Sequence, residues 1–113
     1  MDKIFRKNLL YDFYGELLTE HQRKIYEAVV FDDYSLSEVA EQEDITRQGV
    51  HDMIRRCQKS LLGYEEKLGL VEKFRRTKLL LKDINDAAGA FRADGDMEHI
   101  SEIERLCSEI EGI

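Results

Sequence analysis

Apolar residues recur every three to four positions along most of the chain, with polar residues between them. This spacing is typical of amphipathic helices, whereas the apolar residues of half-buried strands alternate with polar ones. The sequence has no proline and only 7 glycines in 113 residues, so few positions would interrupt a helix. An all-α fold is therefore predicted.

The first third of the chain predicts three helices. The first spans residues 3–18 and carries an apolar face broad enough for a core helix. That face consists of Ile4, Phe5, Leu9, Leu10, Phe13, Tyr14 and Leu17. Two capping boxes follow, Thr19 with Gln22 and Ser35 with Glu38, in which each side chain satisfies a backbone N–H at a helix start. They predict a second helix to about residue 31 and a short third helix to about residue 42.

A much longer helix is predicted after a turn at residues 43–45. Thr46 can cap it, and no strong stop signal occurs before about residue 86. At 1.5 Å per residue such a helix would be about 60 Å long. Gly63 and Gly69 are weak points, but the sequence favours a continuous helix.

The end of the chain predicts a flexible connection and one more helix. The connection covers residues 85–96, which include Asp94-Gly95-Asp96. The last amphipathic helix is indicated by Ile100, Ile103, Cys107 and Ile110. At this length we expect one domain, residues 1–113, with a bundle at 1–60 and the long helix and acidic C-terminal helix at 61–113.

The segment from residue 36 to residue 55 fits a helix-turn-helix without a wing. Such a unit needs a small residue where its two helices meet and apolar residues that fix the crossing angle. Ala40 is the small residue. The apolar wedge would be Val39, Ile45, Val50 and either Met53 or Ile54.

The outer face of the second helix in this unit is a candidate nucleic-acid surface. Arg and Gln can contact base edges in the major groove, and further cations can neutralise phosphates. The candidate residues are Arg47, Gln48, His51, Asp52, Arg55, Arg56 and Lys59. The alternative is a plain scaffold, since a fold alone does not assign a function and Asp52 is acidic.

Charge is unevenly distributed, although the net charge is −7. Residues 46–82 carry 10 basic and 4 acidic side chains, whereas residues 83–113 carry 2 and 9. A basic cluster in the long helix could bind an RNA backbone or an acidic protein surface. It consists of Lys73, Arg75, Arg76, Lys78 and Lys82. The alternative is a solvated face that the acidic last helix folds back to neutralise.

Apolar residues spaced four and three apart form a helix-packing seam across three heptads. The seam consists of Val50, Ile54, Cys57, Leu61, Tyr64, Leu68 and Val71. The chain's own last helix or the same seam of a second subunit could cover it. Because the long helix would protrude, a homodimer is favoured.

Several function classes have no support in the sequence. The two cysteines, Cys57 and Cys107, are far apart, and the three histidines are isolated, so we expect no metal site, disulfide or cofactor. No phosphate-binding or nucleophile motif occurs, so an enzyme and a small-molecule substrate are not expected. No apolar run has the length of a signal peptide or membrane span, which favours a cytoplasmic protein without a membrane partner.

Four stretches of the chain carry a resemblance to a known family. They are Asp12-Phe13-Tyr14 to Leu18-Thr19, Tyr34-Ser35-Leu36-Ser37-Glu38-Val39-Ala40-Glu41, Arg47-Gln48-Gly49-Val50 and Tyr64-Glu65-Glu66-Lys67-Leu68. In order and spacing they resemble the YlxM family of small bacterial proteins. The resemblance implies a helix-turn-helix similar to region 4 of primary sigma factors and a regulatory role in the signal recognition particle pathway.

Two functions are therefore predicted. The first is an accessory or regulatory protein that binds the GTPase of the signal recognition particle, and its RNA, through the basic long helix; the pathway comes from the resemblance alone. The second is a DNA-binding transcription regulator that uses Arg47, Gln48, His51 and Arg55 in the major groove. A structural adaptor is a third and weaker hypothesis.

Overall fold

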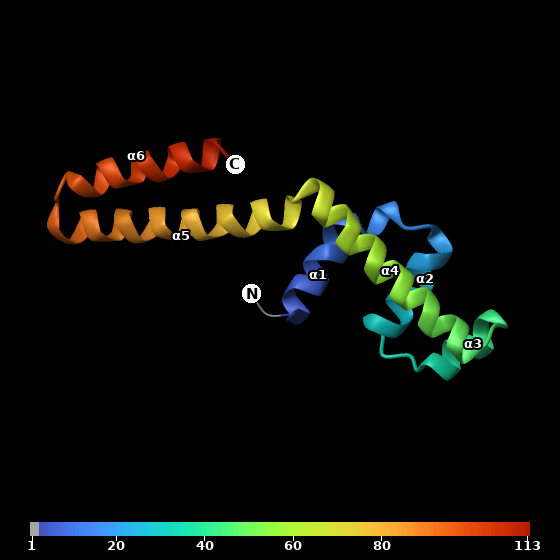
Figure 1. Cartoon of the computed structure of the whole chain (residues 1–113). Helices are drawn as coiled ribbons and strands as arrows, with labels where there is room; N and C mark the ends of the chain where they lie inside the picture. Colours follow the sequence, from blue (N-terminus) through green and yellow to red (C-terminus); the bar gives the residue numbers. More distant parts are fainter. Residues whose placement is uncertain (1–2) are drawn as a thin grey trace. The chain divides into compact units, whose positions relative to one another are not determined.

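The computed structural model describes residues 3–113, and all regular structure in this part of the chain is helical (Figure 1). The elements are α1 (Lys3–Tyr14), the 3-10 helix η1 (Gly15–Leu17), α2 (Glu20–Val30), α3 (Leu36–Glu43), α4 (Arg47–Leu68), α5 (Leu70–Asp94) and α6 (Glu98–Glu111). The prediction of an all-α fold is confirmed. Contacts group the chain into two compact units, residues up to Gly69 and residues from Leu70 onward. The prediction of one domain divided near residue 60 stays a prediction, but this division lies nine residues later.

The first unit packs α1, α2 and α3 around the long helix α4 (Figure 1). Its most buried side chains come from all four helices, and α4 contributes one every three to four residues. The fully buried members are Tyr14, Ile25, Tyr26, Val39, Val50, Cys57 and Leu61. Burial of such apolar area contributes on the order of 1.5–3 kcal/mol per large side chain. This core therefore fixes how α4 lies against the three shorter helices.

Helix α1 is shorter and less buried than its apolar pattern predicts. It ends at Tyr14, and a 3-10 turn replaces the expected last turn. Ile4, Phe5 and Leu17 are 70%, 53% and 56% exposed, so the apolar face does not act as a core face along its full width. Only the part around Leu9 and Tyr14 packs inward, because α4 contacts α1 along one side.

Polar contacts connect the helices of the first unit. The Tyr14 hydroxyl donates a hydrogen bond to the Glu65 carboxylate at 2.6 Å, which ties α1 to the end of α4. On α3, Glu43 accepts an ion pair from Lys24 of α2 at 3.0 Å, and this lowers the pKa of the Glu43 carboxyl. Both predicted capping boxes form, so α2 and α3 begin where the sequence places them.

The continuous helix predicted from residue 46 to residue 86 is wrong. Helix α4 ends at Leu68, and Gly69 adopts the left-handed conformation, with φ +64°, as its C-cap. The Gly69 amide donates to the Glu65 carbonyl, which satisfies one of the last helical acceptors. A residue with a side chain disfavours this conformation, so glycine here stops the helix where Gly63 does not.

We expect opposite stability effects from substituting Gly63, within α4, and Gly69, its C-cap. A Cβ at either position would meet no atom within 4 Å, so only the backbone conformation separates them. We expect Gly63→Ala to raise the free energy of unfolding by about 0.5–1 kcal/mol and Gly69→Ala to lower it by about 1–2 kcal/mol. Urea unfolding of the two variants checks this. Equal shifts would contradict a left-handed Gly69.

The second unit is an antiparallel pair, with α6 lying alongside α5 (Figure 1). Leu106 of α6 and Ala87 of α5 are 3% and 9% exposed, so they mark the packed side of the pair. The flexible connection predicted for residues 85–96 is wrong, because residues 85–94 are the end of α5. That stretch is rich in alanine, the strongest helix former, and only Gly95, at φ +70°, and its neighbours form the turn.

Asp94 holds this turn together. One carboxylate oxygen accepts from the Asp96 amide at 2.9 Å, and the other lies 3.0 Å from Nε2 of His99 in α6. The hydrogen bond to His99 and the one from the Asp96 amide lower the pKa of the Asp94 carboxyl. The same carboxylate raises the pKa of His99 above its ordinary value of 6.5.

This pair predicts a pH-dependent stability of the second unit. The contribution of His99 to the stability of the second unit is fully present below its unfolded pKa, and it is lost as the pH rises through its raised folded pKa. The contribution of Asp94 to stability is present above its unfolded pKa and is lost as the pH falls through its lowered folded pKa. We therefore expect the melting temperature to fall between pH 6 and pH 8, roughly the range above the ordinary His pKa. Asp94→Asn should flatten this change, whereas Asp86→Asn, which removes an exposed carboxylate of α5, should not.

Candidate nucleic-acid interface

The turn between α3 and α4 sets the position of the candidate interface. Asp44 adopts the left-handed conformation, at φ 54°, and its amide bonds back to α3. The Thr46 hydroxyl then accepts from the Gly49 amide at 2.9 Å and caps α4, as predicted. Val39, Ala40, Val50 and Ile54 are buried between the helices, whereas Ile45 is 37% exposed. The wedge is therefore formed largely as predicted, with Ile54 and not Met53 as its last member.

All seven candidate residues of the second helix are exposed. They lie on residues 47–59 of α4, at Arg47, Gln48, His51, Asp52, Arg55, Arg56 and Lys59. The spacing of Arg47, His51 and Arg55 places these three on one side of the helix, because residues four apart are neighbours on a helix surface. A hollow of about 480 Å³ beside them is lined by Leu36, Arg47, Gln48 and His51. Leu36, the first residue of α3, was not predicted as part of this surface.

Asp52 is bonded to its neighbours on this face. Its carboxylate accepts a hydrogen bond from the Gln48 side-chain amide at 3.0 Å and lies 3.9 Å from Nδ1 of His51. Gln48 therefore has one donor engaged within the helix. Its second amide N–H and its carbonyl oxygen remain available for a bidentate contact to a base edge.

The predicted packing seam is covered over Ile54 to Leu61 by the other helices of the first unit and not by the last helix. Ile54, Cys57 and Leu61 are buried in the first unit, where α1, α2 and α3 contact α4. Leu68, at the end of α4, is 49% exposed, and Val71 belongs to α5. The last helix packs on α5 instead. The seam is thus mainly core, and its regular spacing ends with the break at Gly69.

The basic cluster lies in the first half of α5. Lys73, Arg76, Lys78 and Lys82 are exposed, and Lys78 lies 5.3 Å from the centre of the Phe74 ring. Arg75 is different, since its guanidinium forms an ion pair with Glu72 at 2.6 Å, and this raises its pKa.

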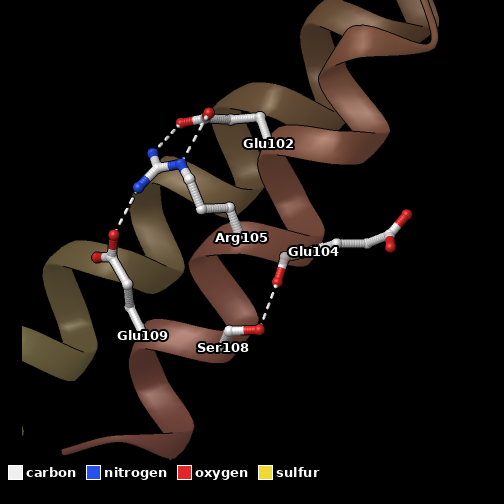
Figure 2. Close-up of polar contacts among 5 residues, drawn as sticks. All are labelled: Glu102, Glu104, Arg105, Ser108 and Glu109. Atoms are coloured by element: carbon white, nitrogen blue, oxygen red, sulfur yellow. Dashed lines mark hydrogen bonds and ion pairs between the residues drawn. The ribbon is translucent and has the colours of Figure 1, made fainter.

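The acidic helix α6 folds back, as the alternative interpretation of the cluster requires, but its glutamates pair within α6 and not with the cluster. Arg105 binds Glu102 on one side and Glu109 on the other, and Ser108 bonds to the Glu104 carbonyl (Figure 2). At 1.5 Å per residue, α6 is about 21 Å long and α5 about 37 Å, so α6 can lie alongside only part of α5. No ion pair joins α6 to the basic cluster among residues 3–113.

Other kinds of site find no support within the described residues. Among residues 3–113, no group of three or more histidine, cysteine, aspartate or glutamate side chains is arranged to hold a metal ion. In the same part of the chain, none of the helices combines the length and apolar character needed to cross a bilayer. Cys57 is buried, which raises the pKa of its thiol.

Comparison with known proteins identifies a family for this chain. A family described as "Putative helix-turn-helix protein, YlxM / p13 like" matches residues 1–102. This description names a fold and no reaction, and it agrees with the α3–turn–α4 geometry. The match extends well beyond the helix-turn-helix and includes most of the second unit.

Individual relatives show the same similarity. A UPF0122 protein of Thermoanaerobacter pseudethanolicus is 43% identical over 111 residues, which cover 97% of this chain and 95% of the relative. One of Acetivibrio thermocellus is 42% identical over 114 residues, covering 97% of both chains. One of Halalkalibacterium halodurans is 46% identical over 87 residues, covering 77% of this chain and 80% of the relative. The chain therefore belongs to the UPF0122 family of YlxM-like helix-turn-helix proteins.

Proposed function

We propose that this protein is a nucleic-acid-binding regulator that inserts the N-terminal half of α4 into the major groove of duplex DNA. The observation that supports this is the exposure of Arg47, Gln48, His51 and Arg55 on a helix that follows a tight, capped turn. Arg47 and Gln48 lie in the first turn of α4, where residues of a recognition helix contact base edges. Arg55 and Lys59 lie further along, where they would neutralise phosphates.

The net charge of −7 does not oppose this proposal, because the charge that a duplex meets is local. Between residues 47 and 59, α4 exposes four cations, Arg47, Arg55, Arg56 and Lys59, against the single carboxylate of Asp52. Acidic side chains elsewhere would limit non-specific binding. Such a protein would show modest affinity for arbitrary DNA and a steep dependence on salt.

The test of this proposal is a selection from a pool of duplexes with random central sequences, using the whole chain at near-physiological salt. We expect a sequence to be enriched and to bind at least about 1,000-fold more tightly than the starting pool. Repeated selection without enrichment would reject sequence-specific DNA binding.

A homodimer is part of this proposal, because a dimer would read two half-sites about one helical turn apart. Ile54 to Leu61 of the predicted seam are already buried, so the dimer would use the part of the seam beyond them, where Leu68 is 49% exposed. Light scattering that shows only monomer at micromolar concentration would reject it.

A second candidate function is an accessory role in the signal recognition particle pathway, with binding to its GTPase and RNA. The observation that favours it is the cluster of Lys73, Arg76, Lys78 and Lys82, which is exposed on α5 and makes no ion pair with α6. The experiment is size-exclusion chromatography of the chain with the GTPase bound to its RNA. A shared peak at near-physiological salt supports this role, and separate peaks reject it.

A further inference from the structure

The first unit contains a groove that is separate from the α4 face proposed to bind DNA. It is a hollow of about 390 Å³ between the N-terminal part of α1 and the second half of α4. Leu10, Leu61 and Leu62 provide apolar lining, and Leu62 is 46% exposed at its edge. Apolar concavities of this size are typical of binding sites, because they bury enough surface to hold a ligand.

The polar part of this groove is basic on one side. Lys3, Arg6 and Lys7 line it, and their spacing of three and four residues places them on one face of α1. Every charged residue in the lining is a cation, and none of the three forms an ion pair within residues 3–113. The remaining polar group is Gln58 of α4.

Tyr26 of α2 also belongs to the lining, and it is 0% exposed. Its hydroxyl is buried and has no hydrogen-bond partner among the described residues. Buried hydroxyl groups are almost always hydrogen-bonded in folded proteins. Tyr26 therefore contributes a fully buried ring to the wall of the hollow, with a hydroxyl that is unsatisfied within the described residues.

We propose that this groove binds an acidic amphipathic helix of a partner protein. An amphipathic helix binds in a groove through apolar side chains spaced three and four residues apart, which match an open apolar channel between two helices. The row of cations on α1 selects glutamate or aspartate beside those apolar residues, since like charges would be repelled. This activity goes beyond nucleic-acid binding and uses different residues.

The acidic amphipathic helix of a second copy fits the groove less well. Helix α6 has the required character, but its apolar side, including Leu106 at 3% exposed, is packed on α5 of its own chain. A second copy would have to open this pair before its α6 could bind. A separate partner has no such cost.

The test is fluorescence anisotropy with the whole chain and a labelled helical peptide of about four turns that carries leucines at i, i+3, i+4 and i+7 and flanking glutamates. A peptide with every glutamate replaced by lysine is the control. We expect the acidic peptide to bind at least about tenfold more tightly than the basic one. Leu62→Glu, and separately the pair Arg6→Glu and Lys7→Glu, should each weaken binding by about tenfold or more.

Leu79→Glu is the matched control variant, because Leu79 is 51% exposed on α5 and lies outside the groove lining. It should bind the acidic peptide as the natural chain does. Equal binding of both peptides, or unchanged binding by Leu62→Glu, overturns the proposal. If Leu62→Glu dissociates a dimer, or abolishes adsorption to anionic lipid vesicles, the groove has another occupant. Either result also overturns the proposal. Leu62→Glu should leave nucleic-acid affinity unchanged, which separates this test from that of the proposed function.

Discussion

Replacing Leu61 by alanine should lower the free energy of unfolding of the first unit by about 2–5 kcal/mol, the range for deleting a buried leucine side chain. Leu61 is 1% exposed on α4, a helix that contacts α1, α2 and α3. The change removes buried apolar surface and leaves a cavity that the surrounding helices fill only in part. The loss is a large fraction of the stability of a small domain, which is roughly 5–15 kcal/mol in total.

The next residue along the chain is the matched control. Leu62 has the same side chain on the same helix, but it is 46% exposed. We expect Leu62→Ala to change the free energy of unfolding by about 0.5 kcal/mol or less, as surface substitutions usually do. Urea unfolding followed by circular dichroism measures both variants. Equal losses would mean that α4 does not pack with the Leu61 side facing the core.

These two leucines also show how far sequence reasoning reaches. The spacing of four and three predicts Leu61 as part of a packing seam and leaves Leu62 outside it, which agrees with their burial. Spacing cannot tell which helix covers the seam, because a partner subunit and a neighbouring helix require the same pattern. The structure assigns the cover to α1, α2 and α3.

The three capped helix starts were predictable, and the end of α4 was not. The side-chain caps at Thr19, Ser35 and Thr46 are local interactions within four residues, so the sequence alone contains them. The end at Gly69 depends on a left-handed backbone conformation that glycine allows but does not require. Gly63 is also a glycine, yet it lies within the helix. Only the surrounding structure separates the two.

The candidate interface follows the same division. Helical periodicity is enough to predict that Arg47, His51 and Arg55 share an outer face. The bond between Gln48 and Asp52, and the hollow that Leu36 completes, depend on rotamers and on the position of α3, which no spacing contains. The groove between α1 and α4 was missed because the whole apolar face of residues 3–18 was assigned to the core. The structure leaves part of that face exposed, so the unusual width of the face was the signal that more than a core contact was present.

The second large effect is expected at Arg47 and Gln48. Replacing both by alanine should reduce affinity for a selected DNA sequence by about 30-fold to 10,000-fold, because each bidentate base contact contributes roughly 1–3 kcal/mol of discrimination. Affinity for arbitrary DNA should change much less, since Arg55, Arg56 and Lys59 remain to neutralise phosphates. Fluorescence anisotropy on the selected and an arbitrary duplex measures both losses. Arg105→Ala is the control, because its guanidinium is paired with two glutamates on α6.

Variants at Asp52 and in the basic cluster of α5 test whether α4 or α5 forms the nucleic-acid contact. Asp52→Ala should raise affinity for both duplexes, because it removes a carboxylate near the phosphates and releases the Gln48 amide. Replacing Lys73 and Arg76 by alanine should leave DNA binding unchanged if α4 is the interface. If this second pair instead removes binding while Arg47 and Gln48 prove dispensable, the nucleic-acid contact lies on α5. The signal recognition particle RNA then becomes the better candidate ligand, since a backbone contact of that kind carries no base-sequence information.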